Sequence, residues 1–120
     1  MSYIDSFVIP ISKENIDSYK EIELIAGKVW IDHGALAYKV CAAEDIDSDP
    51  AGGTFRKAAN ASEGETVIFG FIFFESKAHR DEVNHKAYND PRMKSICDQI
   101  NRPFEADRII FGGFDVIVSM

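Results

Sequence analysis

The sequence predicts an α+β fold of the ferredoxin-like kind, a split βαβ arrangement with one antiparallel sheet, as a single domain over residues 1–120. Three observations indicate it. The expected elements follow one another as strand, helix, strand, strand, helices and strand. The run at residues 66–75 is apolar on both faces, yet the helices suffice to cover only one face of a sheet. We therefore expect a second copy of the chain to cover the other face, in a homodimer of the dimeric α/β-barrel type.

The run at residues 66–75 is the densest apolar stretch of the chain, with no charge between Thr66 and Glu75. Successive side chains of a strand point to opposite faces, so the run divides into two sets: Val67, Phe69, Phe71 and Phe73, and Ile68, Gly70, Ile72 and Phe74. Aromatic and β-branched residues favour a strand here over a helix. Because neither set is polar, we expect this strand to be buried on both faces.

The N-terminal half is expected to supply two strands around a long helix. Residues 3–11 should form the first strand, after which Ser12 caps a helix that Gly34 ends in a left-handed conformation. The apolar stripe of this helix recurs at three- and four-residue steps: Ile16, Tyr19, Ile22, Ala26, Val29, Trp30 and His33. Residues 35–43 should form the second strand, and residues 54–59 a brief extension of the sheet.

The C-terminal half is expected to supply two further helices and the last strand. Ser76 should cap the first of these helices and Asp90 the second, which Pro103 would end. Residues 108–118 should form the last strand. The glycine pair Gly112-Gly113 inside it indicates a bulge or a close approach of the backbone to another group.

Composition restricts the partners that we expect. The chain has 120 residues with 20 acidic and 13 basic side chains, a net charge of −7, which opposes both nucleic acid and anionic membranes. No apolar run approaches the ~20 residues that span a bilayer. No signal peptide is evident, so a cytoplasmic location is expected. The two cysteines, Cys41 and Cys97, are expected to be unpaired thiols in that reducing compartment.

Arg80 and Asn84 are candidates for ligand binding because residues four apart share one face of a helix. That face should look toward the sheet, where Arg80 would bind an anionic or carbonyl group with Asn84 as a hydrogen-bond partner. The alternative is a salt bridge from Arg80 to Asp81, Asp115 or Glu75 that fixes the helix.

His33 is the candidate catalytic residue, because a histidine at a cleft edge acts as an acid or a base near neutral pH. The alternative is a structural or capping role at the end of its helix. Together with Arg80 and Asn84, three aromatic residues are predicted to line a small apolar cleft between sheet and helices: Trp30, Phe69 and Phe71.

No metal site and no cofactor is predicted. His79 and His85 are six residues apart, which places them on different faces of a helix. The acidic stretch at residues 45–49 resembles the start of a calcium loop but lacks the glycine and the glutamate that such a loop needs. Arg92 and Arg108 are expected to pair with carboxylates. No phosphate loop, dinucleotide-binding fingerprint or serine elbow is present in the sequence.

Several motifs together resemble the YbaA-like family of bacterial proteins: His33-Gly34-Ala35-Leu36, Ser76-Lys77-Ala78-His79-Arg80-Asp81 with Asn84, Asp90-Pro91-Arg92-Met93, Pro103-Phe104, and Arg108-Ile109-Ile110-Phe111-Gly112-Gly113-Phe114. The resemblance covers nearly the whole chain; the sequence departs from it at Gly70-Phe71, where a Ser-Trp pair is common. It implies the dimeric α/β-barrel superfamily and no established activity. The wider superfamily includes cofactor-free monooxygenases, haem-degrading enzymes, isomerases and binding proteins.

Two functions follow as hypotheses. The first is a homodimer that binds a small aromatic or carbonyl metabolite in the predicted cleft, with cofactor-free oxygenation or isomerisation as its chemistry. The second is a non-catalytic binding or structural dimer. A void between sheet and helices edged by Arg80 or His33 would favour the first. A solid core, with those two side chains in salt bridges, would favour the second.

Overall fold

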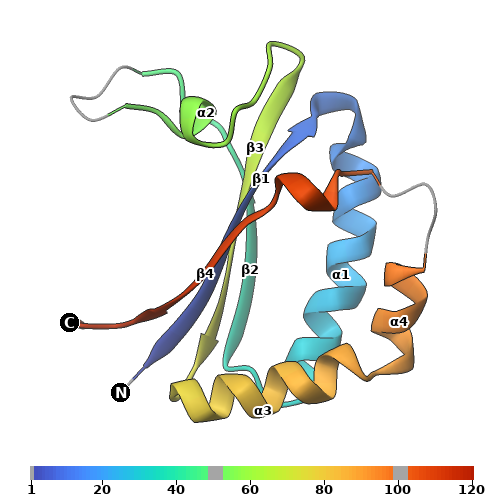
Figure 1. The fold of residues 1–120 in the computed structure, drawn as a ribbon, viewed down its shortest axis with the longest axis vertical. Coiled ribbons are helices and arrows are strands. Elements are labelled where there is room, and N and C mark those ends of the chain that lie inside the picture. Colours follow the sequence, from blue (N-terminus) through green and yellow to red (C-terminus); the bar gives the residue numbers. More distant parts are fainter. Residues whose placement is uncertain (1, 49–52, 99–102) are drawn as a thin grey trace.

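The computed structural model describes residues 2–48, 53–98 and 103–120 (Figure 1). Its elements are β1 (Tyr3–Ser12), α1 (Ile16–Asp32), β2 (Ala37–Ala42), α2 (Phe55–Ala58), β3 (Glu65–Phe74), α3 (Lys77–Tyr88), α4 (Pro91–Cys97) and β4 (Ile110–Asp115). The described strands form a four-stranded antiparallel sheet in the order β2-β3-β1-β4, which confirms the predicted fold class. Residue 49, at the end of the acidic stretch, lies outside the described residues.

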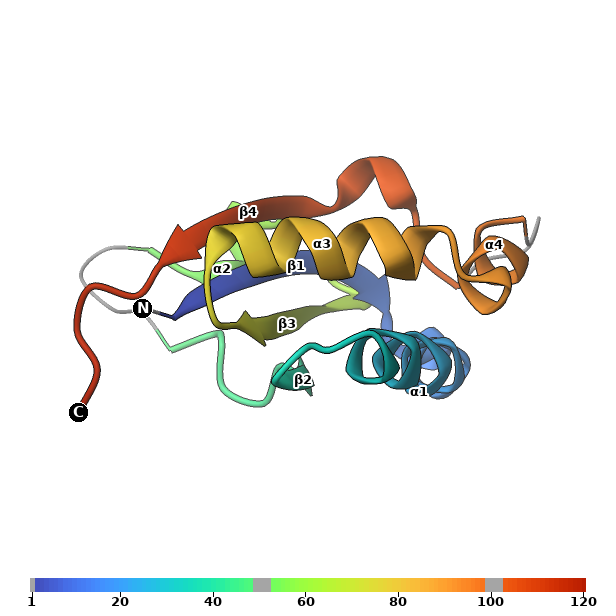
Figure 2. The ribbon, with the colours of Figure 1, turned by 90° about the horizontal axis from the view of Figure 1, so that it is seen from below.

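Helices α1, α3 and α4 lie on one side of the sheet and α2 on the other (Figure 1). Seen from below, α3 lies in front of β1 and α1 lies beside β2, the edge strand (Figure 2). The core forms where the two layers meet, and its side chains include Val29, Ile72, Phe74 and Val83, all buried. No helix in the described part of the chain is long and apolar enough to cross a membrane.

The two sets of β3 side chains face different surroundings. Ile68, Ile72 and Phe74 point toward the helices and are buried. Phe69, opposite Val8 on β1, points to the other face and remains 37% exposed. One apolar face of the sheet is therefore covered within the chain, while much of the other stays open.

Two glycines allow close contacts within the sheet. Phe7 lies opposite Gly70, and a Cβ at Gly70 would overlap the Phe7 ring. A Cβ at Gly113 would overlap the Tyr3 hydroxyl group. The second contact confirms the close approach predicted for the glycine pair in the last strand.

The helix starts at Ser76 and Asp90 are confirmed, since the Ser76 side chain accepts from the His79 N–H and Asp90 accepts from the Arg92 N–H. Ser12 makes no such bond, and a 3-10 turn, Lys13–Asn15, precedes α1. At the other end of α1, the prediction for Gly34 is confirmed by its φ of 114°.

Three predicted boundaries were wrong. The stretch at residues 54–59 contains α2 (Phe55–Ala58) and no strand, because the Thr54 hydroxyl accepts from Lys57 N–H at 3.2 Å and starts a helical turn. Helix α4 ends at Cys97, before Pro103. The last strand is shorter than 108–118, because Ala106–Arg108 is a 3-10 turn and pairing with β1 ends at Asp115.

Candidate functional site

Arg80 and Asn84 lie on one face of α3, as predicted, but both bind a carboxylate of the chain itself. The Arg80 Nη1 group donates to Asp5 Oδ1 at 2.6 Å, and the Asn84 amide donates to Asp5 Oδ2 at 3.0 Å. Trp30 Nε1 donates to Asn84 Oδ1 at 2.9 Å. Asp5 is 1% exposed. These four residues, the Asp5 network, join β1, α1 and α3 and leave the predicted arginine site filled.

The surroundings of Arg80 raise the pKa of its guanidinium and so favour its charged form. Burial alone would lower the pKa of its guanidinium, but the hydrogen bond to Asp81 and the charge of Asp5 raise it. The group also lies over the Tyr3 ring, 5.0 Å from its centroid. The salt bridge to Asp81 was among the sequence alternatives; the one to Asp5 was not. The sequence signal for the Asp5 pairing was an acidic residue inside a largely apolar strand.

His33 follows the last residue of α1 and contacts the start of α4. Its Nε2 lies 2.9 Å from Asp90 Oδ2. Arg92 donates to the same carboxylate at 2.9 Å and to Asp32 on α1 at the same distance. Hydrogen bonds from Arg92 first, and then from His33, hold the pKa of Asp90 well below its usual range. The cluster ties the end of α1 to α4, which is the structural alternative for His33.

Phe69 and Phe71 lie on the face of the sheet away from α1, α3 and α4. They border an open hollow of about 510 Å³, here called the phenylalanine face, together with Ile4, Ser6, Phe73 and Phe114. The six predicted site residues therefore occupy three separate places, and the predicted single cleft is not formed. The physical reason is the two-residue period of a strand, which directs odd-numbered β3 residues away from α1 and α3.

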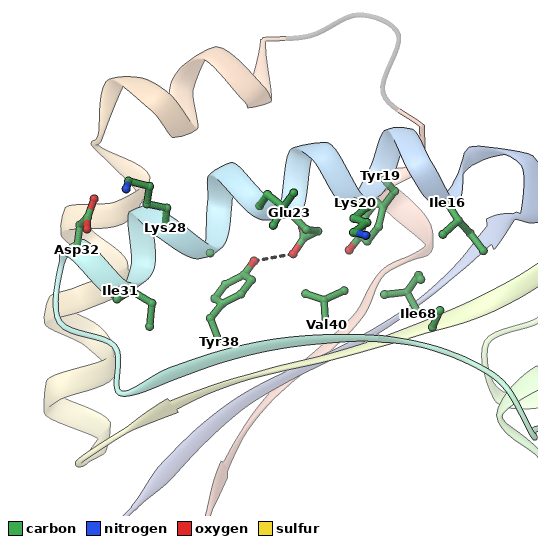
Figure 3. Close-up of a pocket in the computed structure, with 13 residues that line it drawn as sticks. Ile16, Tyr19, Lys20, Glu23, Lys28, Ile31, Asp32, Tyr38, Val40 and Ile68 are labelled. Atoms are coloured by element: carbon green, nitrogen blue, oxygen red, sulfur yellow. Dashed lines mark hydrogen bonds between the residues drawn. The ribbon is translucent and has the colours of Figure 1, made fainter.

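A groove of about 590 Å³ does lie between sheet and helices, bordered by α1 and by β2 (Figure 3). Its walls include the apolar side chains of Ile16, Ile31 and Val40, and the exposed Lys20 and Lys28 lie along it. Neither Arg80 nor His33 borders it. We call it the α1–β2 groove.

Glu23 is the distinctive group of the α1–β2 groove. The Tyr38 hydroxyl donates to Glu23 Oε2 at 2.7 Å across the groove (Figure 3). Burial raises the pKa of Glu23, and hydrogen bonding to Tyr38 and Tyr19 lowers it by less. Among the described residues, no cation pairs with Glu23 in the salt bridges of the chain. Glu23 is therefore a carboxyl group whose pKa lies above that of a solvated glutamate.

The tyrosines respond to the same surroundings. Burial, and then the charge of Glu23, raise the pKa of both Tyr19 and Tyr38. Each hydroxyl thus stays protonated and is able to donate a hydrogen bond to an ionised Glu23 or to accept one from its neutral form. Chemically, the three groups can hold and move a proton beside an apolar wall.

Local sequence explains how Glu23 and Tyr38 meet. Glu23 lies one turn after Tyr19 and one turn before Gly27, so all three share the side of α1 that faces β2. A Cβ at Gly27 would come 2.9 Å from the Tyr38 ring, so the glycine makes room for it. The sequence analysis did not identify Glu23 because it considered only the apolar stripe of α1, and Glu23 is a polar residue at the margin of that stripe.

Comparison with known proteins agrees with the resemblance found in the sequence. The family described as "Protein of unknown function (DUF1428)" matches residues 2–106. The uncharacterized protein YbaA of Escherichia coli (strain K12) is 37% identical over 119 residues, which cover 99% of each chain, and YbaA of Shigella flexneri gives the same values.

A solved structure supports the fold. The structure of Rv0793 from Mycobacterium tuberculosis covers 99% of this chain and 98% of its own, with a TM-score of 0.57 at 8% identity. This likeness supports the α+β fold of the single chain. By its sequence and its full-length relatives, the chain belongs to the DUF1428 family and is similar to YbaA.

Proposed function

We propose that the protein binds a small aromatic or carbonyl metabolite in the α1–β2 groove, with the Glu23–Tyr38 pair as its polar contact. The observation that carries the proposal is the 2.7 Å hydrogen bond of a carboxyl group with a raised pKa, set in an open and mostly apolar groove of about 590 Å³. Apolar pockets with a few converging polar groups and perturbed pKa values are typical of ligand sites.

The chemistry of the groove suits this class of ligand. Its apolar walls would hold a ring or an alkyl body, and the protonated Glu23 would donate a hydrogen bond to a carbonyl or phenolic oxygen. In its ionised form Glu23 would accept a proton from such a ligand. Proton transfer of this kind is the step that isomerisation and cofactor-free oxygenation share, so Glu23 takes the acid–base role that the sequence assigned to His33.

We further propose that the working unit is a homodimer that forms through the phenylalanine face. Phe69 is 37% exposed and Phe114 is 56% exposed on that side of the sheet. Contiguous exposed apolar surface of this kind marks an interaction site. An obligate contact between two copies is expected to bury about 2,000 Å² or more.

A second candidate function is a non-catalytic, structural dimer. Arg80 forms an ion pair and His33 a hydrogen bond, each with a carboxylate of the chain, which is the arrangement expected for this alternative. It predicts no saturable ligand in the α1–β2 groove.

Calorimetric titration with a panel of phenols, quinones, aromatic ketones and haem distinguishes the two functions. Glu23→Leu and Tyr38→Phe remove the polar contact, while Glu21→Leu makes the first of these changes at an exposed position of the same helix. We expect saturable binding by the wild-type protein, about fivefold weaker in the two groove variants and unchanged in the control, since one lost hydrogen bond is worth about 1 kcal/mol. Binding by none of these compounds, or equal binding by all four proteins, would overturn the ligand proposal.

A further inference from the structure

Residues 116–120 form an apolar segment that leaves the sheet. The Val116 N–H still donates to Ser2 O at 3.1 Å, but the following side chains are uncovered. Ile117 is 89% exposed and Val118 is 66% exposed. The segment projects to the side of the sheet away from α1 (Figure 1). Solvent-exposed apolar side chains of this kind indicate a surface that another molecule covers.

An apolar hollow lies at the far end of the same face, beneath α2. It measures about 300 Å³ and is bordered by Cys41, Ile46, Phe55, Val67 and Phe69, with two alanines. Helix α2 projects to the same side of the sheet as residues 116–120 (Figure 1). We call this site the α2 hollow; it continues into the phenylalanine face through Phe69.

The segment cannot reach the α2 hollow of its own chain. It departs beside Ser2, whereas Val67 pairs with Pro10, further along β1 by roughly 26 Å at about 3.3 Å per residue. Residues 117–120, fully extended, span at most about 14 Å. Only another molecule can bring such a segment and such a hollow together.

We propose that residues 116–120 of one copy insert into the α2 hollow of a second copy. A two-fold axis that runs across the strands places the departing end of each sheet opposite the α2 end of its partner, so each copy gives one segment and receives one. The inference rests on the proposed homodimer and adds to it a specific, reciprocal contact. Segment and hollow are both apolar, and both adjoin the face through which the dimer is proposed to form.

Cys41 allows a direct test, because it borders the α2 hollow and is a free thiol. The Cys97→Ser protein receives a cysteine at Ile117 or at Val118, and mild oxidation is followed on non-reducing gels. We expect a covalent dimer from at least one of the two proteins, since a disulfide requires Cα atoms about 4.4–6.8 Å apart. Adding Cys41→Ser should abolish it. A cysteine at the exposed Lys77, on the helix side, should give no dimer that depends on Cys41.

Sedimentation of uncrosslinked protein separates failure of this inference from failure of the dimer proposal. We expect the double variant Ile117→Asp and Val118→Asp to weaken association at least tenfold, whereas Ile25→Asp, on the outer surface of α1, should not. A dimer of unchanged affinity in the double variant, with no crosslink that depends on Cys41, would overturn the segment contact and leave the dimer standing. A monomeric wild-type protein would overturn both.

Discussion

Asp5 and Glu23 are two carboxyl groups covered by the same helical layer, and their surroundings differ. Asp5, on β1, is 1% exposed and receives hydrogen bonds from the Arg80 guanidinium and the Asn84 amide. Glu23, on α1, accepts a hydrogen bond from the Tyr38 hydroxyl and borders an open groove. A cation, Arg80, pairs with the first group, whereas burial without a paired cation raises the pKa of the second. Asp5 therefore joins elements of the fold, whereas Glu23 is a carboxyl group that a ligand could reach.

The space around each group follows the same division. Arg80 and Asn84 donate to Asp5, and the Trp30 indole donates to Asn84, so these groups bind one another. Glu23 is hydrogen-bonded to the Tyr38 hydroxyl, and both border an open groove of about 590 Å³. Buried ion pairs are common in protein cores, so a strong pair is weaker evidence for a functional site than a perturbed and reachable carboxyl group.

The largest effect is expected at the Asp5 network. Arg80→Ala removes the cation and leaves a buried carboxylate without charge compensation, which should lower the free energy of unfolding by about 3–5 kcal/mol. Urea denaturation followed by circular dichroism measures it. Lys86→Ala, which breaks an exposed pair with Glu82, is the matched control and should cost about 0.5 kcal/mol or less. A loss below about 1 kcal/mol in Arg80→Ala would place Asp5 among ordinary surface charges.

The next effect concerns Glu23 and depends on pH. Because the folded protein raises the pKa of Glu23, the native state binds more protons than the unfolded chain above about pH 4.3, and stability falls as pH rises through that window. Glu23→Gln removes this loss. The stability of the variant relative to wild type should therefore increase with pH, by at most about 1.4 kcal/mol per pH unit, and level off above the folded pKa.

Denaturation of the Glu23→Gln protein at pH 5, 6, 7 and 8 checks this sign. Glu21→Gln, at an exposed position of the same helix, should show no such trend. A difference between Glu23→Gln and wild type that is flat with pH would mean that Glu23 titrates like a solvated carboxylate, and the contrast with Asp5 would disappear.

The smallest effect is expected from Tyr38→Phe. The variant loses the hydrogen bond to Glu23 and keeps the ring against α1, so the cost should be about 1 kcal/mol. The cost should be larger at pH 8 than at pH 5, since the hydroxyl donates most strongly to the ionised carboxylate. Tyr88→Phe, at a residue that is 54% exposed, serves as control. An equal cost in both variants would assign the effect to a general loss of hydroxyl groups.

Periodicity and cap residues predicted much of the fold. The apolar run of β3, the helix starts at Ser76 and Asp90 and the order of elements were all readable from local pattern. Helix α2 was not, because it depends on a hydrogen bond that the Thr54 side chain accepts from the Lys57 N–H. The candidate site could be predicted only in part. Arg80 and Asn84 were correctly placed on one helix face, but their partner, Asp5, lies on β1, far away in sequence.

Local sequence pattern alone establishes which side chains share a face, because the helical and strand periods are properties of a few consecutive residues. It determined that Phe69 and Phe71 lie together and that Arg80 and Asn84 lie together. The packed chain was needed to show which face of the sheet α1, α3 and α4 cover, that Asp5 pairs with Arg80, and that Glu23 contacts Tyr38. Those outcomes depend on how separate elements pack, and packing brings together residues that no local pattern relates.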